Sequence, residues 1–506
     1  MMGECIGLQT RIREEHTPDL VKIGGDSIHV IHNASKKLTD PFEDGVIGLF
    51  NNLYTDFKHN SYNTAMFQKI CVFLGLPSTT VGRFVSNRWL CAYDQAVSTL
   101  LLWDALVIFY FAYVPRNQQQ KYEGEVFNII KDVPAVRVEQ IDLFREELKK
   151  QWKDSKLPTQ TRKNKIVASL FENRFSTNLQ LDFIVITMEP MKNFCKEFQS
   201  RKVGIHKLYE KQINLVKKQM TRFVKAEVVV TMKKPGDLKK FKAKDNDLIP
   251  LEDMTVVKAS TRARCGPDSE VYRSFAITAR GALKTSTLQL INKLSFDKDI
   301  LQYLSALCPK QHPSSESTAK LKKLPLYFKV LTHEETDEYD EELLRFSLAD
   351  LPPTSTPDGA LVTPDEWWGQ LFKTGNYPIM LKVFTPALSM FVGPVVEGLF
   401  SEIQNQVTDK RNPLKVSTVS ATQSVRWGLR NDGQPEYLWP IGQNAKPSLK
   451  QSAVHAVQGA YQTSKQSLSK QRKEEEEEDK LYGVTRVTKK SALKELRASF
   501  KRPEIN

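Results

Sequence analysis

The sequence has few cysteines, and no two of them lie close together. Its 506 residues contain six, and no pair has the Cys-x-x-Cys spacing of a zinc ribbon or suggests a disulfide framework. We therefore expect no metal site, and free thiols in a reducing compartment. Residues 1–16 also lack the apolar segment that is typical of a secretory signal peptide.

Long hydrophobic runs are also scarce. The longest candidate is 96–114, AVSTLLLWDALVIFYFAYV, which is short for a membrane span and carries Asp104 near its centre. A charge at that depth is costly in a bilayer. We therefore expect a buried helix, and no membrane as a partner.

Acidic residues are outnumbered by basic ones. The chain has 73 Lys and Arg against 59 Asp and Glu, and its formal charge is +14. Its length is enough for two or three domains, and its hydrophobic content of 40% is ordinary for a globular chain. The basic excess favours an anionic partner such as nucleic acid. The alternative is a protein that is merely basic.

Apolar residues recur at spacings of three and four over much of the chain, as in Val46, Leu49, Phe50, Leu53 and Phe57. This period predicts a mainly α fold. One exception is expected near residues 23–32, where Ile28, Val30 and Ile31 indicate a short buried strand. His29 and His32 lie beside it, and we interpret them as packing residues because two histidines alone make a poor metal site.

Aromatic residues are nearly absent from a lysine-rich run over 217–244. Without rings on which bases could stack, such a run supports contacts to phosphate groups but no reading of sequence. The alternative is an ordinary solvated face. The candidate nucleic-acid contacts of this run are Lys217, Lys218, Arg222 and Lys225.

The segment 395–414, VVEGLFSEIQNQVTDKRNPL, predicts a helix that starts after Pro394 and ends before Pro413. Its apolar face holds Val396, Leu399, Phe400, Ile403 and Val407. On pattern alone, this is a core helix with a solvated end. The residue identities add that Glu397-Gly-Leu-Phe-Ser401, followed by Thr408 to Asn412 and Leu414, resembles the C-terminal signature of hAT-superfamily DNA transposases. Gly398 stands where that family usually has Arg.

Other elements carry the same resemblance, namely Asn87 to Leu90, Asp365 to Trp368, and Tyr377-Pro378. The resemblance implies that Arg88 and Trp89 lie near DNA, with Lys410 and Arg411 as further contacts. It also implies a homodimer formed through the C-terminal region. The implied dimerisation residues are Trp367, Trp368, Leu399, Phe400, Ile403, Val407 and Leu414.

The family resemblance also implies a ribonuclease-H-like core, in which two Asp and one Glu hold two Mg²⁺ ions. Only the Glu position is present, as Glu397, and the two Asp would lie upstream of Met1. One carboxylate cannot hold two metal ions, so we expect no enzyme activity and no cofactor. Mg²⁺ would be bound only if the missing carboxylates exist.

The resemblance divides the chain into five parts: a ribonuclease-H-like remnant (1–40), a helical insertion domain (41–310), a linker (311–360), a dimerisation region (361–432) and a disordered charged tail (440–506). It implies a transposase-derived nuclear protein that is catalytically incomplete and acts through dimerisation, with non-specific DNA binding left open and no small-molecule substrate. One alternative is the C-terminal fragment of a longer hAT transposase or zinc-finger host protein. Others are a plain helical scaffold and a cytoplasmic location.

Overall fold

The computed structural model describes residues 21, 24–58, 60–79, 82, 90–153, 156–199, 204–266 and 269–390. The chain divides into two compact units, Met1–Phe400 and Ser401–Asn506, and all described residues lie in the first. They are mainly helical and form no β-strand; isolated antiparallel bridges join Val224 to Leu248 and Ser355 to Leu361. The prediction of a mainly α fold is confirmed for this part of the chain.

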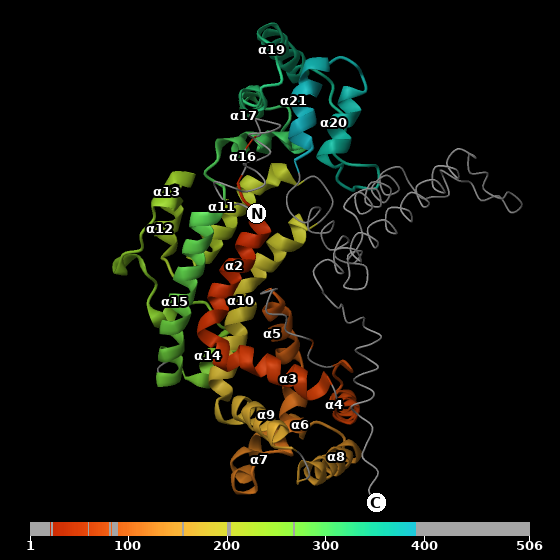
Figure 1. Cartoon of the computed structure of the whole chain (residues 1–506), viewed down its shortest axis with the longest axis vertical. Coiled ribbons are helices and arrows are strands. Elements are labelled where there is room, and N and C mark those ends of the chain that lie inside the picture. The colour runs from red at the N-terminus through yellow and green to blue at the C-terminus, as the bar shows by residue number, and fades with distance from the viewer. Residues whose placement is uncertain are drawn as a thin grey trace, which may run out of the picture. The chain divides into compact units, whose positions relative to one another are not determined.

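Three long helices pack against one another at the centre of the larger of two hydrophobic cores (Figure 1). They are α2 (Ser27–Thr39), α10 (Arg174–Phe198) and α15 (Glu270–Lys293). Small residues line the contact between α2 and α15: Ser286 Oγ donates to the carbonyl of Ala34 at 2.8 Å, and both side chains are buried. Short side chains let the two backbones approach closely. Two further helices, α5 (Cys91–Leu101) and α11 (Ile205–Met220), pack against α10.

The strand predicted near residues 23–32 is wrong, because Ser27–Thr39 is helical. Asp26 begins this helix: its Oδ1 accepts the backbone N–H of Ile28 at 2.9 Å. Ile28, Ile31 and Leu38 then face the core at helical spacing. β-branched residues favour a strand, but the N-cap and burial against two other helices outweigh this intrinsic preference.

Helix α10 continues through Pro190, although the sequence predicts a kink or a break there. A proline has no N–H, so the carbonyl of Ile186 loses its helical partner. Arg222 Nη2 donates to that oxygen at 3.4 Å, and Gln219 Nε2 donates to the next carbonyl, that of Thr187, at 2.7 Å. Side chains from the end of α11 and just beyond it therefore supply hydrogen bonds where the proline disturbs the helix.

A smaller hydrophobic core lies within residues 49–171. Four of its aromatic residues, Phe57, Phe67, Phe109 and Tyr110, form a cluster of contacting rings. The helices that build it are α3 (Gly48–Lys58), α4 (Ser61–Phe73), α6 (Trp103–Phe111), α7 (Arg116–Ile130), α8 (Ala135–Lys153), α9 (Leu157–Val167) and the π-helical turn η3 (Ala168–Glu172).

Most of the apolar run 96–114 is buried, as predicted, although Val97, Leu101 and Asp104 are exposed, and it forms two helices rather than one. Helices α5 and α6 meet at Leu102 with a bend of 67°, and all of 105–111 is buried. No single helix in the described residues is long and apolar enough to cross a membrane. Taken together, the bent pair α5 and α6 has the length and composition of a membrane span, and these two properties are the whole of the evidence for one.

Residues 299–390 are also helical and extend the larger core. The predicted linker, 311–360, contains three helices, so that prediction is wrong. Its acidic stretch buries Tyr339 and Glu342. The helices are α16 (Asp299–Leu304), α17 (Ser315–Leu321), α18 (Pro325–Phe328), α19 (His333–Ser347), α20 (Pro364–Phe372) and α21 (Pro378–Leu388).

Three short helices connect α11 to α15: α12 (Ala226–Thr231), α13 (Pro235–Lys240) and α14 (Ala259–Cys265). The larger core draws on residues from Ile28 to Ala387. The predicted boundaries at 40, 310 and 360 therefore do not separate independent cores. Short 3₁₀ or π turns are η1 (Asp40–Phe42), η2 (Glu43–Ile47), η4 (Asp245–Asp247), η5 (Leu251–Asp253), η6 (Ser305–Leu307) and η7 (Pro309–Gln311).

Candidate nucleic-acid interface

Most of the lysine-rich run lies in a loop, 223–249, that is closed at its base, while Lys217 and Lys218 precede it at the end of α11. Two backbone hydrogen bonds pair the ends of the loop: Lys225 N–H donates to Asp247 O at 2.9 Å, and Ile249 N–H donates to Phe223 O at 3.0 Å. Val229 and Leu238 anchor the loop by packing into the larger core. Burial of these few apolar residues leaves the polar side chains of the loop outside.

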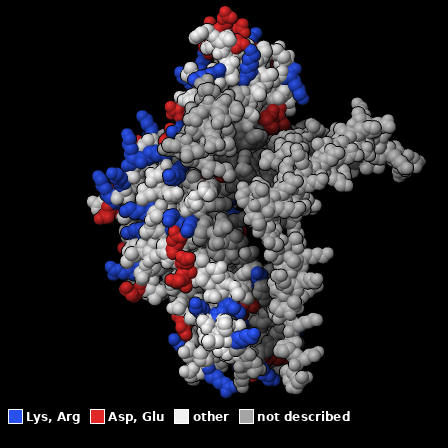
Figure 2. Space-filling view, in the orientation of Figure 1, with Lys and Arg blue, Asp and Glu red and all other residues white. Residues whose placement is uncertain are grey.

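Eight lysines of this run are exposed or half-buried, and we call them the basic surface. Residues 217–244 hold ten Lys and Arg but only two acids, Glu227 and Asp237. Figure 2 shows basic side chains gathered over α12 and α13. The basic surface consists of Lys217, Lys218, Lys225, Lys233, Lys234, Lys240, Lys242 and Lys244.

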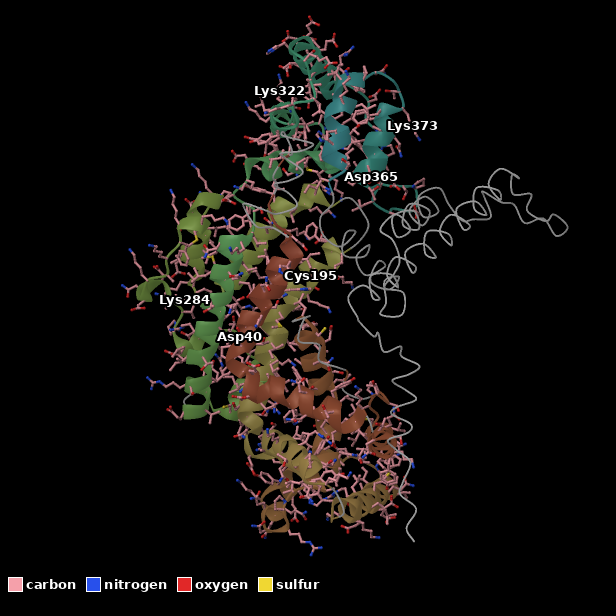
Figure 3. The ribbon with its side chains drawn as sticks, in the orientation of Figure 1. Asp40, Cys195, Lys284, Lys322, Asp365 and Lys373 are labelled. Carbon is pink, nitrogen blue, oxygen red and sulfur yellow. The ribbon has the colours of Figure 1, made fainter. Side chains whose placement is uncertain are left out.

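Within the described part of the chain, no ion pair is formed by any lysine of the basic surface. The neighbouring helix α15, on which α13 packs, adds the exposed Lys284 (Figure 3). Positive charge without internal partners is available to phosphate groups.

Three basic side chains of this region are engaged inside the protein instead. Arg222 Nη1 donates to Thr255 O at 2.8 Å, in addition to its bond to Ile186 O. Burial lowers its pKa. Lys239 donates to Leu294 O at 2.9 Å and pairs with Asp297, and Arg280 donates to Ile249 O. These bonds argue against the predicted contact of Arg222 with DNA, because its guanidinium holds the backbone together.

The rings in this run are not available to bases. Phe223 is buried, and Phe241 is partly buried against the larger core. Within 217–244 the structure therefore offers ammonium groups and no exposed aromatic platform. This arrangement can contact a phosphate backbone, and it gives no means of reading bases.

Trp367 and Trp368 lie inside the larger core, which contradicts their prediction as dimerisation residues. Both are fully buried. Their indole N–H groups donate within the chain, from Trp367 to Pro352 O at 2.8 Å and from Trp368 to Leu307 O at 3.0 Å. His312 packs beside both rings. A second copy cannot contact side chains that the monomer encloses.

The remaining predicted site residues fall outside the described residues and stay predictions. They include Glu397, and the predicted tail 440–506 also falls there. The others are Arg88, Trp89, Leu399, Phe400, Ile403, Val407, Lys410, Arg411 and Leu414. Among the described residues, no three His, Cys, Asp or Glu side chains lie close enough together to hold a metal ion.

Sequence reasoning missed a buried charge cluster in the smaller core. Asp56 Oδ2 accepts from Lys163 Nζ at 2.7 Å and from Tyr110 OH at 2.9 Å, while its Oδ1 accepts from Arg162 Nε at 3.3 Å. The ammonium of Lys163 lies 4.1 Å from the centre of the Tyr113 ring. These residues come from three separate segments, so no local motif could have indicated them.

No family model, no curated protein and no solved structure matches the chain. The resemblance to hAT transposases therefore depends on the motif residues of the sequence alone.

Proposed function

We propose that this chain is a catalytically incomplete protein derived from a hAT transposase, and that it binds DNA in the nucleus without sequence specificity. The observation that carries the proposal is the basic surface, with eight lysines and no internal ion pair among the described residues. Lysine offers a point charge rather than the planar fork with which arginine recognises bases. Phosphate contact is the chemistry that such a surface supports best.

The strength of this binding depends on salt. Each phosphate that a lysine neutralises releases condensed counterions, with a slope of about −0.9 per contact in a plot of log affinity against log salt. If half of the basic surface engages DNA at once, we expect a slope of about −3.6. The affinity would then fall by roughly 100-fold or more between about 50 and 200 mM salt.

Fluorescence anisotropy with two labelled duplexes of unrelated sequence tests this proposal. A variant with Lys233, Lys234, Lys242 and Lys244 all changed to Gln is expected to bind at least tenfold more weakly and to have a shallower salt slope. The matched control changes four exposed lysines of other helices and turns, and should bind nearly as the parent does. Its substitutions are Lys131→Gln, Lys150→Gln, Lys310→Gln and Lys373→Gln. Equal losses in the two variants, or binding that ignores salt, would disprove a role for the basic surface.

Self-association is the second part of the proposal. The apolar face of 395–414 supports it, as does the family's use of this region for dimerisation. We expect Phe400→Asp and Ile403→Asp to lower the sedimentation mass of the chain while helicity is retained. A parent chain that sediments as a monomer at micromolar concentration would contradict a homodimer.

The absence of catalysis is the third part. Glu397 is the single family carboxylate in this chain, so strand cleavage in Mg²⁺ or Mn²⁺ is not expected. Cleavage that is lost on Glu397→Gln would show that the site is complete after all. Two motif Asp residues in the reading frame upstream of Met1 would favour the alternative, a fragment of a longer transposase.

A further inference from the structure

A cavity of about 200 Å³ lies where α6, α7, α10 and α14 come together. None of the lysines of the basic surface lines it. Its walls combine rings and charged groups: Trp103, Glu125, Arg174, Phe175, Asn178 and Arg264, with Thr261 beside them. Trp103 packs against both hydrophobic cores, so the cavity lies where the two cores meet.

The two guanidinium groups of the cavity differ in their surroundings. Arg174 forms an ion pair with Glu125 and lies 4.5 Å from the centre of the Phe175 ring. Arg264 is exposed. Among the described residues its guanidinium makes a single long hydrogen bond, in which Nη2 donates to Thr261 Oγ1 at 3.5 Å. No ion pair within 4 Å is formed by Arg264 in the described part of the chain. The Asp104 carboxylate interacts with Arg264 electrostatically without an ion pair, so Arg264 is the less engaged of the two cations and is open to a ligand.

The cavity also holds a polar atom with unused capacity. Oε2 of Glu125 is shielded from solvent and is engaged by the guanidinium of Arg174. The amide nitrogen of Asn178 donates to Arg174 O at 2.9 Å, which leaves the amide oxygen as an acceptor. A ligand with an N–H group could donate to this oxygen.

We propose that this cavity binds a small planar aromatic molecule that carries one anionic group and an N–H donor. Arg264 binds the carboxylate or phosphate, Trp103 and Phe175 contact the ring, and the amide oxygen of Asn178 accepts from the N–H. The volume is below the range of about 300–1,000 Å³ typical of drug-sized ligands, which limits the ligand to one ring system with its acidic group. Aromatic amino acids fit this limit, whereas nucleoside monophosphates share the chemistry but add a ribose, so they test a phosphate as the anionic group.

This inference is independent of DNA binding by the basic surface, because the two sites share no residue. It revises the sequence-based prediction that the chain has no small-molecule ligand. The cavity residues come from four segments of the chain, around 103, 125, 174–178 and 261–264. Their proximity is a property of the fold.

Isothermal titration calorimetry of the full chain tests the proposal. The probes are tryptophan, tyrosine, cytidine monophosphate and adenosine monophosphate, with uncharged indole as the comparison. We expect saturable binding of at least one anionic probe, and binding of indole that is at least tenfold weaker. Binding by the amino acids alone would identify a carboxylate ligand, and binding by the nucleotides alone a phosphate ligand.

Two substitutions locate the binding in the cavity. Arg264→Gln and Phe175→Leu should each weaken it at least fivefold. The controls Arg273→Gln on α15 and Phe127→Leu on α7, both at exposed positions outside the cavity, should not. Thermal unfolding of each variant checks that the fold is intact. The proposal is overturned if no anionic probe saturates at low millimolar concentration, if indole binds equally well, or if the cavity variants bind as the controls do.

Discussion

Replacing Asp56 by asparagine should destabilise the smaller core strongly, although the two side chains have nearly the same shape. The Asp56 side chain is 1% exposed, and that of its partner Lys163 is 5% exposed. An asparagine at this position can still accept the hydrogen bond from Tyr110, but it lacks the charge that balances Lys163. Burial already lowers the pKa of Lys163, and Asp56 opposes that shift.

The expected loss of stability on Asp56→Asn follows from the buried, unpaired ammonium of Lys163 that remains. Removing one partner of a buried ion pair costs about 3–5 kcal/mol, because the other charge stays buried and unpaired. The rings of Tyr110 and Tyr113 contact the ammonium, and contacts of this kind are worth about 1–2 kcal/mol. They keep the expected cost of Asp56→Asn near the lower end, about 3 kcal/mol.

Urea unfolding of four proteins measures this cost: the parent, Asp56→Asn, Lys163→Met and the double variant. Asp56→Asn leaves the buried charge of Lys163 unpaired, and Lys163→Met removes that charge. The loss of unfolding free energy in the double variant should therefore be at least about 1 kcal/mol smaller than the sum of the two single losses. Asp340→Asn is the control; it breaks an exposed pair with Lys322 and should cost under about 1 kcal/mol. A cost for Asp56→Asn as small as that of the control, or strictly additive effects, would refute the reasoning.

Three further changes test other parts of the fold. Burial lowers the pKa of His206 to about 4, so between about pH 6.5 and 4 the unfolded chain binds a proton that the folded chain does not. The free energy of unfolding should therefore fall by up to about 3 kcal/mol as the pH falls through that window. In urea unfolding, His206→Gln should make this pH dependence smaller. Arg222→Gln should cost about 1–3 kcal/mol in the same assay while DNA affinity is unchanged, because its guanidinium donates to Ile186 and Thr255. Glu342→Gln should cost about 1–3 kcal/mol, because Glu342 accepts the N–H groups of Ile379 and Met380 at the start of α21; exposed Glu341→Gln should cost almost nothing. An unchanged pH profile, a loss of DNA affinity, or equal effects at Glu341 and Glu342 would each contradict the corresponding argument.

Helical periodicity in the sequence located many of the helices but not their partners. Val46, Leu49, Phe50, Leu53 and Phe57 are all buried, as their spacing predicts. They nevertheless divide between the two cores, with Val46 in the larger and Leu53 and Phe57 in the smaller. A period of about 3.6 shows which face is buried, and it carries no information on what buries it.

The segment 311–360 shows a different limit. Its polar composition predicted a linker, yet α19 begins with a capping box in which Thr332 and Glu335 satisfy each other's backbone N–H groups. The acidic stretch also places Glu342 where it caps α21, a helix that starts only at Pro378. Composition is an average over a segment, and single buried side chains such as Tyr339 and Glu342 decide whether that segment packs.

The two candidate sites, the basic surface and the cavity, also differ in how far the sequence could predict them. The lysine run was visible because its charge is concentrated in the sequence, but the sequence could not separate Arg222 from the lysines that surround it. The cavity was invisible, because Trp103, Arg174 and Arg264 belong to distant segments. Charge density is a local property, whereas burial and proximity depend on the whole fold.

Arg222 connects these observations physically. Pro190 leaves the carbonyl of Ile186 without its helical donor, and Arg222 supplies one from just beyond the end of α11. The next residue, Phe223, accepts the hydrogen bond from Ile249 that closes the base of the lysine-rich loop. The carbonyl that Pro190 leaves without a donor in α10 is thus bonded by Arg222, the residue just before the loop that carries most of the basic surface. The same guanidinium also binds Thr255 O beyond the loop's other end, so the loop is held on both sides. The basic surface therefore owes its position to an arginine that is not itself available to DNA.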